Sequence, residues 1–148
     1  MSNREKAKCL NAALKAMADF RRAFGRPLDG SMIAEIYVAY ALCLCFTGQR
    51  NEHGYDLVDA DKRRYQVKHR DKLTGNVDLN NFSFDFLILV HLDEDYRPQG
   101  LWRLPVEKAK EIFVARPRFR RFQATQKKVR SHATALEVRD WLVIVPPS

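Results

Sequence analysis

The feature that most constrains the fold is a long apolar segment near the middle of the chain. Residues 82–92 read Phe-Ser-Phe-Asp-Phe-Leu-Ile-Leu-Val-His-Leu, and the second half of this segment is almost continuously apolar. Such a short, continuous apolar run is typical of a β-strand whose two faces are both covered by other parts of the protein. We therefore predict that residues 82–92 form the central strand of a sheet.

Helical patterns lie on both sides of this strand in the sequence. Residues 3–24 have apolar side chains at helical spacing, and Gly25-Arg26-Pro27 breaks that pattern. Residues 31–46 are apolar nearly all round, which is typical of a helix buried against a sheet. A further strand is expected at residues 100–104, and Pro105 opens a helix that extends to about Ala115.

Length and composition favour one domain. The chain has 148 residues, of which 46% are hydrophobic and 11% aromatic, and this is ample for a core. We expect a single α/β domain over residues 1–148, with a mixed β-sheet flanked by α-helices. No apolar run reaches the roughly 18 residues that span a bilayer, and the N-terminus lacks a signal-peptide pattern. The sequence therefore predicts a soluble, cytoplasmic protein with no membrane partner.

Several apolar side chains outside the central strand are expected to be buried. Leu10, Leu14 and Met17 form one stripe of the first helix, with Ala13 and Phe20 as further candidates. The cysteines, three in number, have a spacing that suits neither a zinc site nor a disulfide pair, so we expect small core residues at Cys9, Cys43 and Cys45. Residues 135–146 are expected to return a strand or short helix to the core.

The most informative polar segment is residues 54–70, which has the pattern of a β-hairpin. Its second arm alternates with period two, so one face carries Tyr65, Val67 and His69 and the other carries Gln66, Lys68 and Arg70. The sequence Asp-Ala-Asp-Lys-Arg between the arms is rich in turn-forming residues, so the arms should pair antiparallel. A loop is expected to follow at residues 73–81, beside the hairpin.

The hairpin pairing has a chemical consequence. If the turn is centred near Asp61, Asp56 lies opposite Gln66, and Lys68 shares the face of Gln66. A carboxylate and an amide oxygen can hold Mg²⁺, which prefers oxygen ligands, while a lysine can orient an attacking water or stabilise a phosphorane-like state. Asp59 remains open as a rival ligand, whereas Asp61 is discounted because it sits in the turn.

Glu35 is the second acidic candidate. It is the one ionisable acid in the apolar segment 31–46. A carboxylate buried there requires a metal, a cationic partner or a raised pKa. The alternative is a solvated glutamate in the first turn of the helix, where the helix dipole favours negative charge.

The spacing of these residues resembles the motif of a known protein family. Asp56 followed by Gln66-Val67-Lys68 resembles the split motif of the PD-(D/E)xK nuclease superfamily, and the Gln-x-Lys form is similar to the Mrr-type branch. Residues 30–35, the apolar helix and Gly54-Tyr55-Asp56 also resemble small uncharacterised domains of that superfamily, so the resemblance covers about residues 28–92.

The resemblance implies a restriction-endonuclease-like fold and Mg²⁺-dependent hydrolysis of DNA that leaves a 5′-phosphate, with Mn²⁺ able to substitute and endonucleolytic cleavage favoured. It assigns Glu35, Asp56, the Gln66 side-chain oxygen and the Val67 carbonyl to the metal, and Lys68 to assisting attack. It also allows a homodimer, because many such nucleases pair two copies. No proline precedes Asp56, and Gln66 contributes no charge. The neutral Gln66 supports an alternative, an inactive nuclease-fold module that binds DNA or a protein partner.

Excess positive charge points to a polyanionic partner. The chain has 26 Lys and Arg against 18 Asp and Glu, a net charge of +8. The charge is concentrated in a basic segment at residues 116–134, in which Phe119 and Phe122 are interleaved with cations and no acid occurs. We expect phosphate contacts with DNA, and less readily with RNA, whereas the alternative is that these aromatic residues are ordinary core anchors. The candidate contact residues are Arg70, Lys72, Arg116, Arg118, Arg120, Arg121, Lys127, Lys128 and Arg130.

Overall fold

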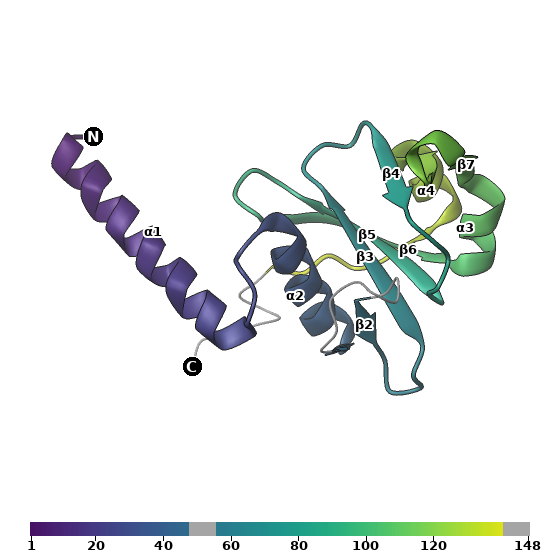
Figure 1. The fold of residues 1–148 in the computed structure, drawn as a ribbon, viewed down its shortest axis with the longest axis horizontal. Coiled ribbons are helices and arrows are strands. Elements are labelled where there is room, and N and C mark those ends of the chain that lie inside the picture. The colour runs from purple at the N-terminus through teal and green to yellow at the C-terminus, as the bar shows by residue number, and fades with distance from the viewer. Residues whose placement is uncertain (48–55, 141–148) are drawn as a thin grey trace.

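A computed structural model gives the fold of residues 1–47 and 56–140 (Figure 1). The α/β class predicted from the sequence is confirmed, because helices pack beside a mixed sheet. That sheet has six strands in the order β1-β2-β3-β5-β6-β9, and a second sheet has three strands in the order β4-β8-β7.

The apolar segment in the middle of the sequence supplies the central strand, as predicted, but the strand begins at Phe86 rather than at residue 82. Strand β5 (Phe86–Leu92) lies between β3 (Arg64–Arg70), to which it is parallel, and β6 (Pro98–Pro105), to which it is antiparallel. Its side chains alternate between two apolar clusters, with Ile88 and Val90 in one and Leu87 and Leu89 in the other. Both faces of β5 are therefore covered, which explains its continuous apolar sequence.

Helix α2 (Gly30–Leu42) covers one face of the large sheet. The Asp29 side chain caps it by accepting a hydrogen bond from the Met32 N–H at 2.7 Å. The helix ends four residues before the predicted Phe46, because Cys43 adopts a left-handed backbone conformation with φ of 54°. The chain then forms β1 (Cys45–Phe46), which pairs antiparallel with β2 (Leu57–Val58).

The other face of the large sheet is covered by α3 (Val106–Ile112), α4 (Gln126–His132) and the small sheet. The small sheet consists of β4 (Asn76–Leu79), β8 (Arg121–Thr125) and β7 (Val114–Arg116), and a 3₁₀ turn η1 (Pro117–Phe119) joins β7 to β8.

The small sheet corrects two predictions. Residues 73–81 are not all loop, because Val77 and Leu79 are buried and β4 pairs with β8. Only two apolar residues, Val77 and Leu79, alternate with polar ones in this segment, and this pattern is too short to predict a strand. Helix α3 ends at Ile112 rather than near Ala115, because Val114 to Arg116 pair with β8.

Helix α1 (Asn3–Phe24) contributes no buried residue. Leu10, Leu14 and Met17 are 60%, 54% and 46% exposed, so the predicted buried stripe is wrong. The physical reason is the junction after the helix, where Gly25 has a φ of 68° and the chain turns away, so that α1 extends from the rest of the molecule (Figure 1).

The prediction that the cysteines are buried is also wrong, since Cys9, Cys43 and Cys45 are all exposed. Cys9 lies on the projecting α1, and the other two lie at the turn after α2 and on the edge strand β1 instead of inside a helix.

Among the described residues, the predicted closing element, residues 135–146, is present only at its start, since residues 136–140 form neither strand nor helix. Strand β9 (Thr134–Ala135) is antiparallel to β6. Residues 141–146 of the predicted element lie outside the described residues, as do residues 48–55, which include the first two residues of the predicted hairpin. Across residues 1–47 and 56–140, no helix combines the length and apolar character needed to cross a bilayer.

Candidate functional site

The β2–β3 hairpin has the predicted pairing and register. The strands are antiparallel with Leu57 opposite Tyr65 and Val58 opposite Arg64. The Asp56 N–H continues the ladder by donating to the Tyr65 carbonyl at 2.8 Å. The first described residue of the hairpin, Asp56, is thereby held beside Gln66, as the hairpin pattern predicted.

Both rival aspartates, Asp59 and Asp61, lie at the hairpin turn. The Asp59 carboxylate accepts hydrogen bonds from the backbone N–H groups of Asp61 and Arg63, each at 2.9 Å, and pairs with the Arg63 Nε at 2.7 Å. It also accepts from the Tyr65 hydroxyl at 3.0 Å. Asp59 therefore stabilises the turn, and Asp61 lies exposed within it.

Asp56 is buried at the start of the hairpin. Only 8% of the residue is exposed, and its Oδ2 accepts from the Val67 N–H at 2.9 Å and from the Gln66 side-chain nitrogen at 3.1 Å. Burial raises the pKa of Asp56, whereas the Val67 hydrogen bond and the positive charges of Lys68 and Arg26 lower it. The Val67 side chain itself packs in the core against α2.

Glu35 is brought to the same place by α2. It is 4% exposed, so the solvated alternative is wrong, and its Oε2 accepts from the Arg26 guanidinium at 2.9 Å. Burial and the negative charge of Asp56 raise the pKa of Glu35 to about 7, although Arg26 acts in the opposite direction. The two carboxylates are thus close enough to repel each other, and Glu35 binds a proton readily near neutral pH.

Lys68 completes the group of predicted site residues. It is partly exposed on β3. Burial lowers the pKa of its ammonium group, and the negative charges of Asp56 and Asp78 act in the opposite direction. The structure therefore brings together Glu35, Asp56, Gln66 and Lys68 from α2 and the hairpin. The arrangement combines acidic oxygen ligands, a neutral amide and an amine that can hold or release a proton.

Sequence reasoning missed two residues of this site, Arg26 and Asp78. Arg26 lies between Gly25 and Pro27 and was interpreted only as part of a helix break. Asp78 lies on β4, in the segment expected to be a loop, where it accepts hydrogen bonds from Arg121 at 3.3 Å and Gln123 at 2.9 Å. One signal for Arg26 was available in the sequence. An arginine just before an apolar helix with a single acid is a candidate partner for that acid.

The predicted phosphate-contacting cations occupy different settings. Arg70 donates to the Asn76 carbonyl at 3.1 and 3.0 Å, and Arg130 donates to the Leu73 carbonyl at 2.9 Å, so both hold the chain that leads into β4. Arg121 pairs with Asp78. The remaining candidates are exposed, and they are Lys72, Arg116, Arg118, Arg120, Lys127 and Lys128.

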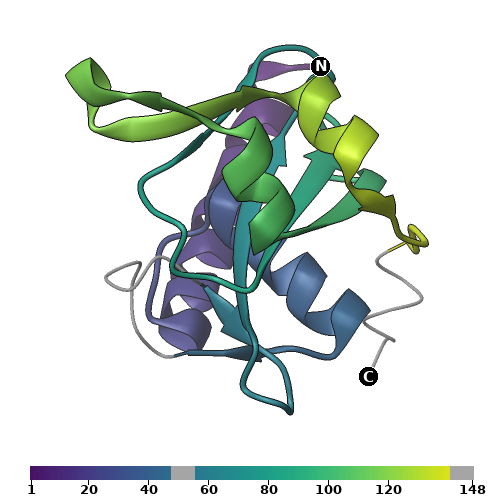
Figure 2. The same ribbon diagram turned by 90° about the vertical axis from the view of Figure 1, so that its right-hand side faces the viewer.

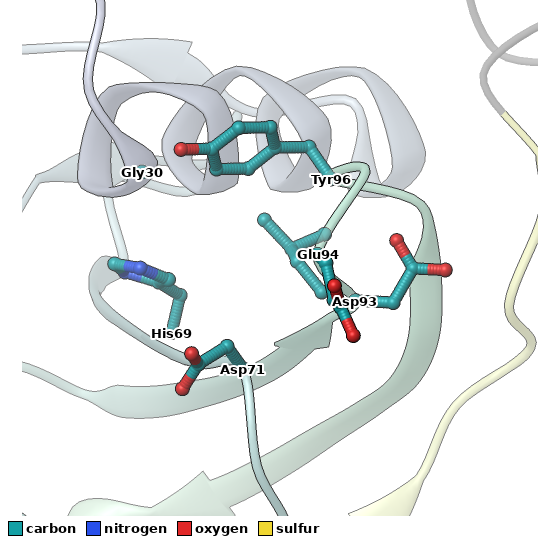
Figure 3. A pocket seen from close by; sticks show the side chains of 7 residues that line it. Gly30, His69, Asp71, Asp93, Glu94 and Tyr96 are labelled. Carbon is teal, nitrogen blue, oxygen red and sulfur yellow. The ribbon is translucent and has the colours of Figure 1, made fainter.

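A separate pocket of about 230 Å³ lies at the N-terminal end of α2 (Figure 3). Gly30, His69, Asp71, Glu94 and Tyr96 line it, together with Leu92 and Asp93. It shares α2 and β3 with the predicted site but contains none of the predicted site residues. His69 reaches it because alternate side chains of β3 point to opposite faces, as the sequence pattern predicted.

Within the described residues, no group of three or more His, Cys, Asp or Glu side chains has the arrangement of a metal site. The predicted site has two acids, and its third oxygen ligand would come from Gln66. The chain matches no protein-family model and no curated protein. Its function is therefore inferred from the geometry around Asp56 and from the resemblance of its motif.

Proposed function

We propose that this protein is a metal-dependent nuclease of the PD-(D/E)xK type that hydrolyses DNA phosphodiester bonds by endonucleolytic cleavage. The observation that carries the proposal is the place of Asp56, since its carboxylate interacts with Glu35 of the separate helix α2 and with Gln66 and Lys68 of its own hairpin. If the match to the motif arose by chance, its residues would not be expected to lie around one buried carboxylate, as they do around Asp56.

The donor set fits Mg²⁺ or Mn²⁺. Buried carboxylates that repel each other gain from a cation between them, and both ions accept carboxylate and amide oxygens. The Gln66 nitrogen donates to Asp56, so the amide oxygen is the atom it would offer to the ion. Glu35 and Asp56 would supply the negative ligands, with the Val67 carbonyl as a further candidate.

A bound Mg²⁺ would lower the pKa of a coordinated water and offset negative charge on the phosphate. The residues of the chain would position the reacting groups. Asp56 is held by the Val67 N–H, and Gln66 is held by Asp56, so both enter the reaction with fixed orientation. Burial lowers the pKa of Lys68. Its ammonium form would then donate a proton to the departing oxygen more readily, and its neutral amine form would accept one from the attacking water.

The substrate proposal rests on charge. The exposed cations of the basic segment lie on β7, η1 and α4, beside the small sheet that carries Asp78. Because Asp78 also interacts with Lys68, a polyanion at the predicted site would extend over these cations. DNA binding of this kind weakens steeply as salt concentration rises.

The test is cleavage of plasmid and linear DNA in Mg²⁺ or Mn²⁺ by wild type and Lys68→Ala. We expect Lys68→Ala to cut at least about a hundred-fold more slowly while it binds DNA as tightly as wild type. Lys110→Ala, which changes an exposed lysine on α3, is the matched control and should cut at the wild-type rate. A Lys68→Ala variant as active as wild type would refute the proposed role of this residue.

The ion pair between Arg26 and Glu35 favours a second candidate function. An arginine that neutralises the buried acid can stabilise the fold in place of a metal, and the neutral Gln66 weakens metal binding further. The protein would then be an inactive nuclease-fold module that binds DNA or a protein partner. Salt-sensitive DNA binding by wild type, without metal binding or cleavage, is the result that this alternative predicts.

A further inference from the structure

The tip of the β7–β8 hairpin carries an exposed aromatic side chain surrounded by arginines. Phe119, the last residue of η1, is 58% exposed. The guanidinium carbon of Arg121 lies 5.0 Å from the centre of its ring, and that of Arg118 lies 5.9 Å from it. Single exposed apolar side chains are ordinary on protein surfaces, so it is the two guanidinium groups beside this ring, at the end of a cationic hairpin, that suit it to a polyanionic partner.

The backbone of the same tip is strained. Arg120 follows Phe119 with a φ of 52° and a ψ of 45°, a left-handed conformation that costs a residue with a side chain about 1 kcal/mol or more. Neither the strain nor the exposed ring contributes to the core. Lys62 and Tyr96 close two other tight turns of the chain in the same left-handed conformation, so the strain belongs to the turn, and the exposed ring is the feature that a partner can use.

The shape of the hairpin limits the kind of partner. Strand β4 pairs with β8 only from Phe122 onward. Among residues 1–47 and 56–140, no strand therefore lies on the β4 side of Arg116, Arg121 and the turn between them. Figure 2 shows this hairpin extending beyond the helices and the large sheet. Two-stranded β-ribbons are among the elements with which proteins bind the major or the minor groove of duplex DNA.

The hairpin is also tied to the proposed cleavage site. Asp78 pairs with Arg121 and accepts from Gln123 at the base of the hairpin, and its charge acts on Lys68. Gln123 lies four positions after Phe119 in the chain, and four steps of extended strand span at most roughly 13 Å. That reach is shorter than one turn of duplex DNA, which is roughly 34 Å. One duplex can therefore extend from the base of the hairpin, where Asp78 lies, to its tip.

We propose that the β7–β8 hairpin enters a groove of duplex DNA and places the Phe119 ring against the bases, with Arg116, Arg118 and Arg120 on the flanking phosphates. This inference rests on the proposed function for its choice of DNA, and it adds contact with bases to the phosphate contacts expected from the sequence. Apolar side chains that enter a groove partly unstack the base step they touch. The flanking arginines supply the electrostatic part of the binding energy.

The test measures binding of a short duplex containing 2-aminopurine, in EDTA so that no cleavage occurs, over a range of salt concentrations. Phe119→Ala should weaken binding by roughly five- to a hundred-fold, the range seen when an aromatic stacking residue is removed, and should abolish the rise in 2-aminopurine fluorescence. Because no cation is lost, the dependence of log affinity on log salt should keep the slope of wild type.

Two variants of the same hairpin act as controls. Val114→Ala shortens another exposed apolar side chain, 53% exposed on β7, and should bind as wild type does. Arg116→Ala removes one phosphate contact and should reduce the salt slope by about one while the fluorescence change remains. Thermal unfolding should be the same for all variants, because each changed side chain is exposed.

The outcomes separate this inference from the proposed function. Equal affinity and an equal fluorescence change for Phe119→Ala and wild type would overturn the role of Phe119 and leave the nuclease proposal standing. Tighter binding of the single strand than of the duplex would overturn groove entry. A wild-type protein that binds no DNA would overturn both proposals, whereas loss of cleavage in Lys68→Ala with an intact fluorescence change would support both.

Discussion

The buried carboxyl group of Glu35 predicts an unusual dependence of stability on pH. Its pKa is raised from 4.5 to about 7 in the folded protein. Between these values the folded state holds more protons than the unfolded state, so the free energy of unfolding falls as pH rises. Integration between pH 5 and pH 8 gives a loss of about 2.5 kcal/mol from this one group.

The variant that tests this reasoning is Glu35→Gln, which keeps the size of the side chain and removes the ionisation. The free energy of unfolding of wild type should fall relative to that of Glu35→Gln by about 2.5 kcal/mol from pH 5 to pH 8, or roughly 8 °C in Tm for a domain of this size. Urea unfolding followed by circular dichroism at each pH measures the difference.

Glu107→Gln is the matched control, since Glu107 is exposed on α3, and its difference from wild type should stay nearly constant with pH. A difference between wild type and Glu35→Gln that is the same at pH 5 and pH 8 would refute the reasoning. Under the nuclease proposal, Mg²⁺ should also raise the Tm of wild type at pH 8 and leave that of Glu35→Gln nearly unchanged.

Other predictions concern the same site. Asp56→Asn keeps an acceptor for the Val67 N–H but removes the charge, so isothermal titration should show Mn²⁺ binding by wild type and at least tenfold weaker binding by the variant; equal affinities would exclude Asp56 as a ligand. Metal binding by Glu35 requires its deprotonated form, so wild-type affinity for Mn²⁺ should be about tenfold weaker at pH 6 than at pH 8, and a flat profile would argue against Glu35. Asp29→Ala removes the cap of α2 and should cost about 1 kcal/mol in urea unfolding; no loss would show that the cap is dispensable.

Local patterns in the sequence were sufficient for much of the architecture. The apolar run of β5, the turn chemistry around Asp61 and the period-two alternation of β3 each depend on neighbours along the chain. The hairpin register follows from these patterns alone, because the turn fixes which residues of the two arms face each other. The position of Asp56 beside Gln66 is therefore predictable from residues 56–66 alone.

The errors occurred where burial depends on distant parts of the chain. An amphipathic pattern shows that Leu10 and Leu14 share a face of α1, but it cannot show that the chain turns away at Gly25 and leaves that face exposed. The strand β4 was missed for the same reason, since its stability comes from pairing with β8, more than forty residues later in the sequence.

The sequence by itself determined the order of the main elements and the residues of the hairpin, because both follow from periodicity and turn chemistry within short windows. Only the tertiary structure decided that Arg26 pairs with Glu35, that Asp78 interacts with both Lys68 and Arg121, and that Phe119 stands at the end of a projecting hairpin. These arrangements join different structural elements, at separations from nine positions for Arg26 and Glu35 to 43 for Asp78 and Arg121. They depend on how α2 and the small sheet pack against opposite faces of β5.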